Sequence, residues 1–424
     1  MKRLSLLLLV LVAALGLPCA PAGATVFFQC PTLADPGDPA SVVYNGTFTD
    51  TNGNKMIRAD EGEIVNPVSP SQVCVHLSSG DGFVNMADKL LDPDGDGNGH
   101  LQYMFGFKNI TGVPDAEAMM AGMLAAEFPA PTLQFKEGDE VYLSLTNVGM
   151  MMRPDLFDPH TVHWHGFPNA SAIFDGEPMS SISINMGATL TYYYKVVEPG
   201  TFMYHCHVEA TEHMQMGMLG NLYVTPAQDG TTFNFNGRDY TRFTYNDGDG
   251  STGYDVDFPV QILSFDSNFH DQHIAVQPLP FAEMYDDYPM FNGRGYPDTM
   301  NPDALANAFD GQFSQPMPTI ITAQQGERIL LRLSSLNTTS FHSLTVQGIP
   351  MQVIGEGSRQ RRSFYTTNTV TLGGGQSMEV LLDTQGVAPG TYFLYTTNLD
   401  HLANKAEDYG GMMTEIIIAE NGVQ

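Results

Sequence analysis

The sequence predicts an all-β protein made of two tandem β-sandwich domains, and two observations lead to this prediction. Short runs rich in Val, Ile, Thr, Tyr and Phe, such as "EVYLSLTNV", "RILLRLSSL" and "SMEVLLDT", are separated by Gly, Pro, Asn and Asp. Such runs are typical of antiparallel sandwiches and barrels. The 424 residues also exceed what one such domain needs. The segment 115–128 is an exception, expected to form a short surface helix or an ordered loop.

A weak internal repeat supports two copies of one domain. "PAPTLQFKEGDEVYLSLTNV" matches "PMPTIITAQQGERILLRLSSL", "PHTVHWHGFP" matches "FHSLTVQGIP", and "EPGTFMYHCH" matches "APGTYFLYTTN". Order, spacing and turn residues agree between the copies. We therefore expect a first domain over 25–228, with an N-terminal extension, and a second over 229–424. The linker is expected near Ala227 to Gly230.

The N-terminus predicts a secretory signal over residues 1–24. Lys2 and Arg3 precede an apolar run, and an Ala-Gly-Ala sequence ending at Ala24 has the form of a signal-peptidase site. The run is too short to span a bilayer easily. A lipid anchor on Cys19 is the alternative interpretation. We expect a periplasmic or secreted protein without a membrane span.

Charge and cysteine content narrow the possible partners. The net charge is −29, and removal of Lys2 and Arg3 with the signal makes it more negative. This balance argues against nucleic acid or anionic membrane surfaces as partners. In an oxidising compartment Cys30 and Cys74 are expected to pair. Cys206 is then left over and needs another role.

The leftover cysteine lies among histidines in "YHCHVEATEHMQMGM". Neighbouring side chains on a strand point to opposite faces, so Cys206 is expected on one face and His205 and His207 on the other. His163 and His165 in "PHTVHWHG" share a face by the same rule. The second copy keeps two histidines but has other residues at the remaining corresponding places, so the fold itself does not require these histidines. The histidines that it keeps are His342 and His401. At the positions that correspond to the first copy's other histidines and its cysteine, it has Thr345, Gln347, Thr396, Thr397 and Asn398.

Two imidazoles, a thiolate and a weak axial thioether make a blue-copper site. The candidates here are His160, Cys206, His213 and Met218. The simpler interpretation of these segments is a buried free cysteine beside surface histidines. The presence of six histidines in two short segments disfavours that interpretation. A zinc site is a stronger alternative interpretation of a cluster of cysteine and histidine. Zinc, however, has no need of a methionine ligand or of a histidine pair on the opposite face.

These two segments resemble the copper motifs of multicopper oxidases and of the related copper nitrite reductases, and "PMFNGRGYPDT" resembles the start of a later multicopper oxidase domain. The resemblance covers nearly all of the chain after the signal, and implies two cupredoxin-like Greek-key domains and a homotrimer with a copper centre between subunits. It assigns His160, Cys206, His213 and Met218 to a type 1 copper. It assigns His163, His165, His205 and His207 to a type 2/type 3 centre.

The second domain departs from the oxidase pattern. A complete three-copper centre needs eight histidines, and the second copy has lost the obvious pairs. His401 in "NLDHLANKAEDYGG" resembles the histidine that a neighbouring subunit gives to the type 2 copper of nitrite reductases. His163 stands where those reductases have a catalytic aspartate, and Gln347 stands near their catalytic histidine. His270 and His273 remain open as further ligands.

Together with the predicted signal, the resemblance implies an exported copper-dependent oxidoreductase. Electrons from a small molecule, a metal ion or a redox protein would pass through the type 1 copper to an interfacial centre that reduces dioxygen. His163 and His207 are the expected catalytic residues, with Asp175 either a proton source or a turn residue. The alternatives are a nitrite-reductase-like enzyme with type 1 and type 2 copper, and a blue-copper electron carrier. For the segment 92–100 a tight acidic turn is favoured over a calcium loop.

Overall fold

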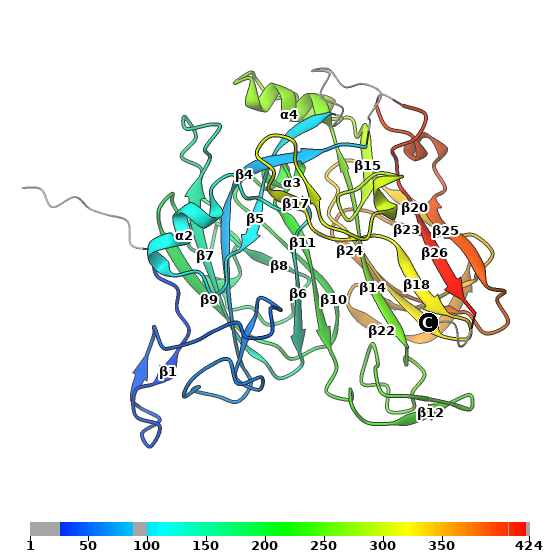
Figure 1. The fold of residues 1–424 in the computed structure, drawn as a ribbon, viewed down its shortest axis with the longest axis horizontal. Coiled ribbons are helices and arrows are strands. Elements are labelled where there is room, and N and C mark those ends of the chain that lie inside the picture. The colour runs from blue at the N-terminus through cyan, green and yellow to red at the C-terminus, as the bar shows by residue number, and fades with distance from the viewer. Residues whose placement is uncertain (1–25, 88–99, 406, 421–424) are drawn as a thin grey trace, which may run out of the picture.

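The computed structural model describes residues 26–87, 100–405 and 407–420. Two successive pairs of β-sheets account for most of the chain, and Figure 1 shows them as a blue-to-green half beside a half that runs from green to red. The prediction of an all-β protein with two tandem sandwiches is confirmed. The predicted signal over residues 1–24 and most of the acidic segment 92–100 lie outside the described residues. Among the described residues no helix is long and apolar enough to cross a bilayer.

The first sandwich faces a five-stranded sheet against a four-stranded one. Its core includes Val75, Leu143, Leu133 and Trp164, all fully buried. Core residues recur at every second position of several strands, for example Val141, Leu143 and Leu145, as a sandwich requires. The five-stranded sheet contains β3 (Ile57–Arg58), β4 (Gln72–Asn85), β5 (Leu101–Asn109), β7 (Glu140–Gly149) and β9 (Thr189–Lys195). The four-stranded sheet, in spatial order, contains β6 (Ala130–Lys136), β11 (Leu219–Thr225), β10 (Gly200–His205) and β8 (His163–His165).

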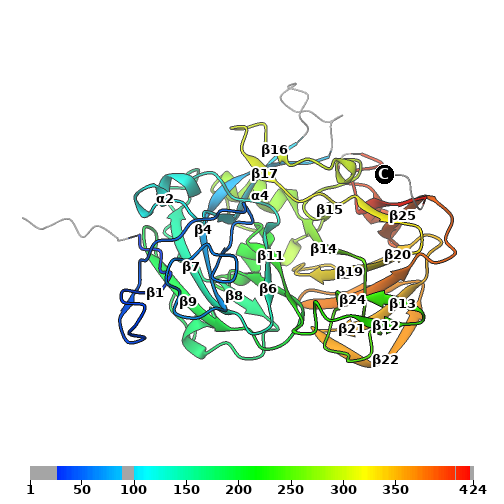
Figure 2. The ribbon, with the colours of Figure 1, turned by 60° about the horizontal axis from the view of Figure 1, so that its bottom comes forward.

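The second sandwich repeats this plan with a separate core that includes Leu331, Leu344, Val380 and Ile416. Figure 2 shows its strands stacked beside those of the first sandwich. The six-stranded sheet, in spatial order, contains β15 (Tyr288–Phe291), β14 (Val256–Phe265), β19 (Arg328–Ser335), β24 (Gln376–Asp383), β21 (Met351–Glu356) and β22 (Arg359–Thr367). The five-stranded sheet contains β18 (Ile321–Gln324), β26 (Met413–Ala419), β25 (Gly390–Thr396), β20 (His342–Val346) and β23 (Val370–Leu372).

Short elements connect the sheets and cover their ends. The predicted helical segment 115–128 forms a helix only over its first half, α2 (Asp115–Gly122). The other helices are α3 (Ala210–Gln215), α4 (Ser267–Ile274), η1 (Ala172–Phe174), η2 (Phe281–Glu283), η3 (Asp298–Met300) and η4 (Leu399–Leu402). The two-stranded ribbons are β1 (Thr32–Leu33) with β2 (Val42–Val43), β12 (Phe233–Phe235) with β13 (Arg238–Tyr240), and β16 (Leu305–Ala306) with β17 (Phe313–Gln315).

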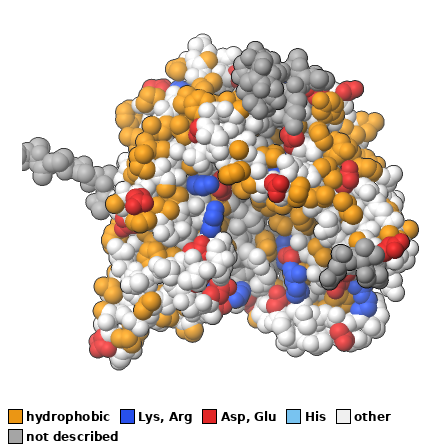
Figure 3. All heavy atoms as spheres, viewed as in Figure 1, with side chains coloured by type: hydrophobic (Ala, Val, Ile, Leu, Met, Phe, Trp, Pro, Cys, Tyr) orange, Lys and Arg blue, Asp and Glu red, His pale blue; other side chains and the backbone are white. Residues whose placement is uncertain are grey.

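The two sandwiches share an apolar cluster at their junction. Met203 and Leu219 of the first sandwich belong to one buried cluster with Leu263, Phe265 and Leu336 of the second. Polar groups are paired across the same junction, since the backbone N–H of Thr201 donates to the buried carboxylate of Glu379 at 2.8 Å. The junction therefore fixes β10 against the second sandwich. On the face drawn in Figure 3, acidic side chains are scattered among other types rather than gathered into one patch.

Cys30 and Cys74 form a disulfide, as predicted, with a sequence separation of 44 residues. It ties the N-terminal extension to β4, where a small buried cluster surrounds it. Cys206 is the remaining described cysteine, and it is free and buried.

Removing this disulfide should destabilise the protein. Closing a loop of 44 residues restricts the unfolded chain by an amount worth about 4 kcal/mol. We expect the double variant Cys30→Ser/Cys74→Ser to lose about 3–4 kcal/mol of unfolding free energy in a denaturant titration. Wild-type protein treated with a reductant is the control, and an unchanged unfolding midpoint in the variant would contradict the prediction.

Candidate metal centre

Cys206 follows β10 directly and lies at the centre of a buried group of donor atoms. Its Sγ is 3.2 Å from Nδ1 of His213 and 3.7 Å from Nδ1 of His160. The three ligand atoms lie within 4.8 Å of one another, and all three residues are buried. His160 comes from the segment before β8, and His213 comes from α3. Residues that are 46 and 7 positions from Cys206 in sequence therefore converge on its sulfur.

Met218 is held next to Cys206 through the backbone. The N–H of Cys206 donates to the carbonyl of Met218 at 3.1 Å, and the N–H of Met218 donates to the carbonyl of His213 at 2.8 Å. The Met218 side chain is fully buried in the same apolar core as Cys206. The four residues predicted as one ligand set are thus assembled at one place.

Burial and charge act differently on the two imidazoles. Burial lowers the pKa of His160 well below its usual range. Burial also disfavours the charged form of His213, but the Cys206 sulfur and the Asp158 carboxylate outweigh it and raise its pKa to about 10. Asp158 lies 3.9 Å from Nε2 of His213, on the side of the ring away from the sulfur. Two imidazole nitrogens and a sulfur in a buried pocket suit copper or zinc, and a methionine next to them favours copper.

The other histidines gather on the opposite side of the strand end. Strands β8 and β10 pair with His163 opposite His205, and the ring centroids of these two residues are 5.2 Å apart. His165 and His207 lie within 5.5 Å of the His205 ring. Trp164, between the two β8 histidines, points the other way and stacks on Tyr194. The alternation predicted from the sequence is therefore present.

Hydrogen bonds orient these rings toward a common space. Nδ1 of His163 donates to the carbonyl of Asp175 at 2.6 Å, and Nδ1 of His205 donates to the carbonyl of Cys206 at 2.8 Å. The Nε2 atom of His205 lies 3.3 Å from Nδ1 of His165. Burial lowers the pKa of His163 and of His165, and lowers the pKa of His205 to about 3. The rings are therefore neutral at pH 7, which is the form that binds metal.

The four histidines line a hollow of about 340 Å³ whose other wall comes from the second domain. That wall consists of Leu336, Asn337, Thr338, Gly374 and Gly375. It supplies no histidine among the residues that the structure describes. The four-histidine cluster therefore holds half of the ligand set that the resemblance implies.

His401 does not join this cluster. Its Nδ1 lies 3.2 Å from Nδ1 of His342, within the second sandwich. The role predicted for His401 at the copper of a neighbouring subunit stays a prediction, and within its own subunit the ring contacts His342.

His270 and His273 also have other partners and do not add to the ligand set. His270 bonds to the carbonyls of Tyr103 and Gln215, and His273 bonds to Glu212.

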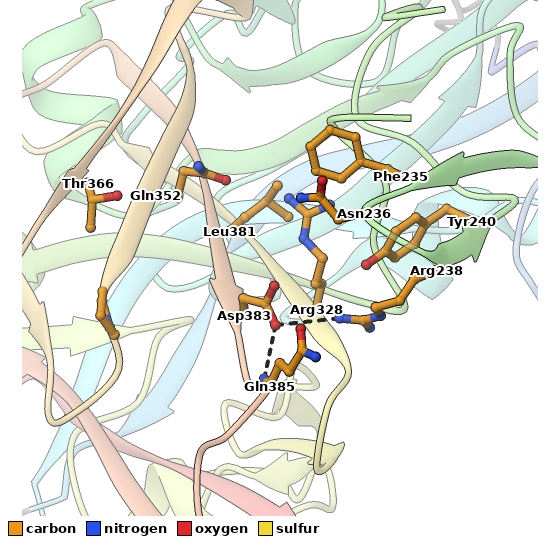
Figure 4. Close-up of a pocket in the computed structure, with 11 residues that line it drawn as sticks. Phe235, Asn236, Arg238, Tyr240, Arg328, Gln352, Thr366, Leu381, Asp383 and Gln385 are labelled. Atoms are coloured by element: carbon orange, nitrogen blue, oxygen red, sulfur yellow. Dashed lines mark hydrogen bonds and ion pairs between the residues drawn. The ribbon is translucent and has the colours of Figure 1, made fainter. Parts of the chain in front are cut away.

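A separate hollow in the second domain is drawn in Figure 4, and it contains none of these histidines. Arg238 and Arg328 line it with aromatic rings, and Arg238 forms ion pairs with Asp255 and Asp383. The candidate metal-ligating side chains of the first domain therefore lie outside this hollow, at the end of β10.

Comparisons with known proteins agree with this geometry. Two sequence models of the multicopper oxidase family match residues 109–229 and 267–420. The L-ascorbate oxidase of Cucurbita maxima is 24% identical over 302 residues, which cover 67% of this chain and 45% of that protein. The multicopper oxidase MCE of Talaromyces pinophilus is 32% identical over 120 residues, 28% of this chain and 18% of that protein. The chain thus spans less than half the length of these relatives.

Solved structures show the same fold. A blue copper oxidase from Nitrosomonas europaea aligns with a TM-score of 0.59 and 22% identity, over 82% of this chain and 86% of that one. A copper nitrite reductase from Nitrosomonas europaea aligns with a TM-score of 0.56 and 17% identity, over 83% and 95%. The expected cupredoxin-like architecture is confirmed. With both of its sandwiches matched and its histidines and cysteine gathered at one strand end, the chain belongs to the multicopper oxidase family.

Proposed function

We propose that this protein oxidises a reductant with dioxygen, which is reduced to water. The observation that carries the proposal is the arrangement at the end of β10. A buried cysteine with two imidazoles lies on one side of the strand, and four histidines lie on the other. Copper bound at these two places would take electrons singly from a donor and deliver them together to dioxygen.

The chain itself provides a short connection between the two places. His205 and His207 are the immediate neighbours of Cys206, so each is joined to it by one peptide unit. The hydrogen bond from Nδ1 of His205 to the Cys206 carbonyl adds a second link at 2.8 Å. An electron that leaves the sulfur therefore crosses bonded atoms rather than solvent.

Protons for water formation have a candidate source in Asp175. Its carboxylate lies 3.5 Å from Nδ1 of His163 and is about one-third exposed. Asp175 therefore links the His163 ring to solvent, and its backbone carbonyl holds the same ring. We assign His163 and His207 to the site of dioxygen reduction and Asp175 to proton delivery.

The assembly is proposed to be a homotrimer. Four histidines make half of a three-copper ligand set, so a neighbouring subunit must supply the remainder. Export through the N-terminal signal suits a protein with a disulfide. The electron donor is a small molecule, a metal ion or a redox protein that reaches the Cys206 site.

Two other functions share most of this geometry. A nitrite-reductase-like enzyme would use the Cys206 site and a single further copper on His165 and His205, and the fold similarity to a copper nitrite reductase favours keeping this candidate. A non-enzymatic electron carrier would use the Cys206 site alone. The number of coppers bound at the Cys206 site and in the four-histidine cluster separates the three.

Gly375 tests whether the second domain shapes the four-histidine cluster. A Cβ atom there would lie 2.8 Å from Nε2 of His165, at a φ of +81°. We expect Gly375→Ala to displace the His165 ring and lower the copper content of the cluster, while the absorption of the Cys206 site stays. Copper analysis and visible spectroscopy measure both.

Gly386→Ala is the matched control for that variant. Gly386 has a φ of +79° and nothing within 4 Å of its added Cβ, so it brings similar backbone strain, about 1–2 kcal/mol, without crowding. The same copper content in both variants would show that the second domain does not shape the cluster.

The Cys206 site should give copper-loaded protein an intense visible charge-transfer band. We expect Cys206→Ser to abolish this band, because a serine hydroxyl does not replace the thiolate ligand. Circular dichroism of the variant checks that it is folded. A folded variant that keeps the wild-type spectrum would contradict the assignment of Cys206 as a copper ligand.

Turnover and assembly are tested together on the purified full chain. We expect oxygen consumption with a generic electron donor and a trimer by light scattering. His163→Ala should reduce oxygen consumption to background while the visible band remains.

Nitrite consumption without oxygen consumption would select the nitrite-reductase-like alternative. Neither activity, with copper at the Cys206 site and none in the four-histidine cluster, would select the carrier. A monomer at micromolar concentration would contradict the shared centre.

A further inference from the structure

The second domain contains its own pair of facing imidazoles, outside the sites described above. His342 begins β20 and His401 lies in η4, next to the end of β25. Strands β26, β25 and β20 are neighbours in one sheet, at the right of Figure 1. The two Nδ1 atoms are 3.2 Å apart, and His342 is fully buried.

The backbone around this pair repeats the backbone around Cys206, bond for bond. In the first domain Cys206 N–H donates to Met218 O at 3.1 Å, and Met218 N–H donates to His213 O at 2.8 Å. In the second domain Thr396 N–H donates to Met412 O at 3.1 Å, and Met412 N–H donates to His401 O at 2.8 Å. Thr396 therefore occupies the place of Cys206, Met412 that of Met218, and His401 that of His213.

The strand register gives the same correspondence for the fourth position. Tyr395 pairs with Thr345, as His205 pairs with His163, so the second domain's counterpart of His160 is His342, three residues before Thr345. The ring pairs agree as well. The centroids of His342 and His401 are 4.9 Å apart at an interplanar angle of 50°, against 5.0 Å and 56° for His160 and His213.

Two further features point to a cation at this place. Nε2 of His342 lies 3.3 Å from Oγ of Ser264, which leaves Nδ1 directed at His401, and such a second bond commonly orients a metal-binding imidazole. Asp286 lines the same hollow as His401 and is 95% buried, yet neither of its carboxylate oxygens has a hydrogen-bond partner. A buried carboxylate without a partner is costly unless a positive charge is close.

We propose that the second domain binds a copper ion through Nδ1 of His342 and Nδ1 of His401, with Met412 as a thioether donor and Asp286 as the nearby counter-charge. Imidazoles suit copper, and a thioether favours copper over harder ions. Thr396 has no thiolate to offer, so this site lacks the intense band of the Cys206 site and escapes detection in the visible spectrum. A hydrogen bond between two neutral rings accounts for the 3.2 Å contact alone, but leaves Asp286 without a partner.

The first test counts copper in the full chain after dialysis against a weak chelator. We expect His342→Gln and His401→Gln each to lose the same single copper equivalent while the Cys206 band stays. Asp286→Asn should weaken binding about tenfold. His76→Gln is the control, because His76 is equally buried but hydrogen-bonded to Thr146 at 2.7 Å, and it should keep the wild-type count.

Copper counts that stay at the wild-type value in both histidine variants would overturn the proposal. Zinc retained at this place in preference to copper would overturn the choice of metal. Because the Cys206 band reports the first domain separately, failure here leaves the proposed oxidase function untouched.

A gain-of-function variant gives a second test that does not depend on removing a ligand. In the Cys206→Ser background, the additional change Thr396→Cys places a thiol at the position equivalent to Cys206. We expect copper loading to restore an intense visible band, and a further His342→Gln change to remove it. A folded, copper-loaded Cys206→Ser/Thr396→Cys protein without such a band would overturn the proposal.

Discussion

The peptide units on either side of Cys206 hold the first domain's two groups of metal-binding side chains together. A strand directs neighbouring side chains to opposite faces, so the sulfur and the two adjacent imidazoles diverge from a single point of the backbone. Strand β10 is hydrogen-bonded on both edges, to β11 and to β8, which leaves no freedom for this point to rotate. The sheet therefore places His163, His165 and His205, and Cys206 directly follows β10. His160, His213 and Met218 reach the sulfur from outside the strands.

The junction between the sandwiches extends this constraint to the second domain. The apolar cluster that contains Met203 and Leu219 fixes β10 against residues of the second sandwich, and Ser334 donates to Asn221 across the same junction. As a result the loop that contains Gly375 closes the four-histidine hollow without providing a ligand to it. At this hollow the first domain provides the histidines, and the second domain sets the shape of the space around them.

The sequence was sufficient for the features that depend on local pattern. The all-β class, the repeated domain, the Cys30–Cys74 pair and the opposite orientation of Cys206 and its neighbours follow from alternation, spacing and cysteine count. The contact between His401 and His342 was not predicted, because the direction of the His401 ring depends on the turn η4 and on the distant His342.

The contributions of Asp158, Gly375 and Asp286 were missed for a related reason, since each acts on a residue far away in sequence or on the other wall of a hollow. The internal repeat was the sequence feature that could have indicated the second-domain pair, His342 and His401. The sequence alignment placed Thr396, Thr397 and Asn398 opposite the histidines and the cysteine. The hydrogen-bonded register of the strands shifts that alignment by one residue, so that Thr396 is the counterpart of Cys206. A shift of one position on a strand reverses the face on which each side chain lies.

Trp164 gives the first domain an optical property of its own. It is the single tryptophan of the chain, it is fully buried, and it lies between His163 and His165 with its indole stacked on Tyr194 at a centroid distance of 3.7 Å. Because its backbone neighbours are both cluster histidines, a Cu(II) ion bound on the other side of the strand would lie close enough to quench its emission. The second domain has no tryptophan, so indole emission from the unlabelled protein reports on the first domain.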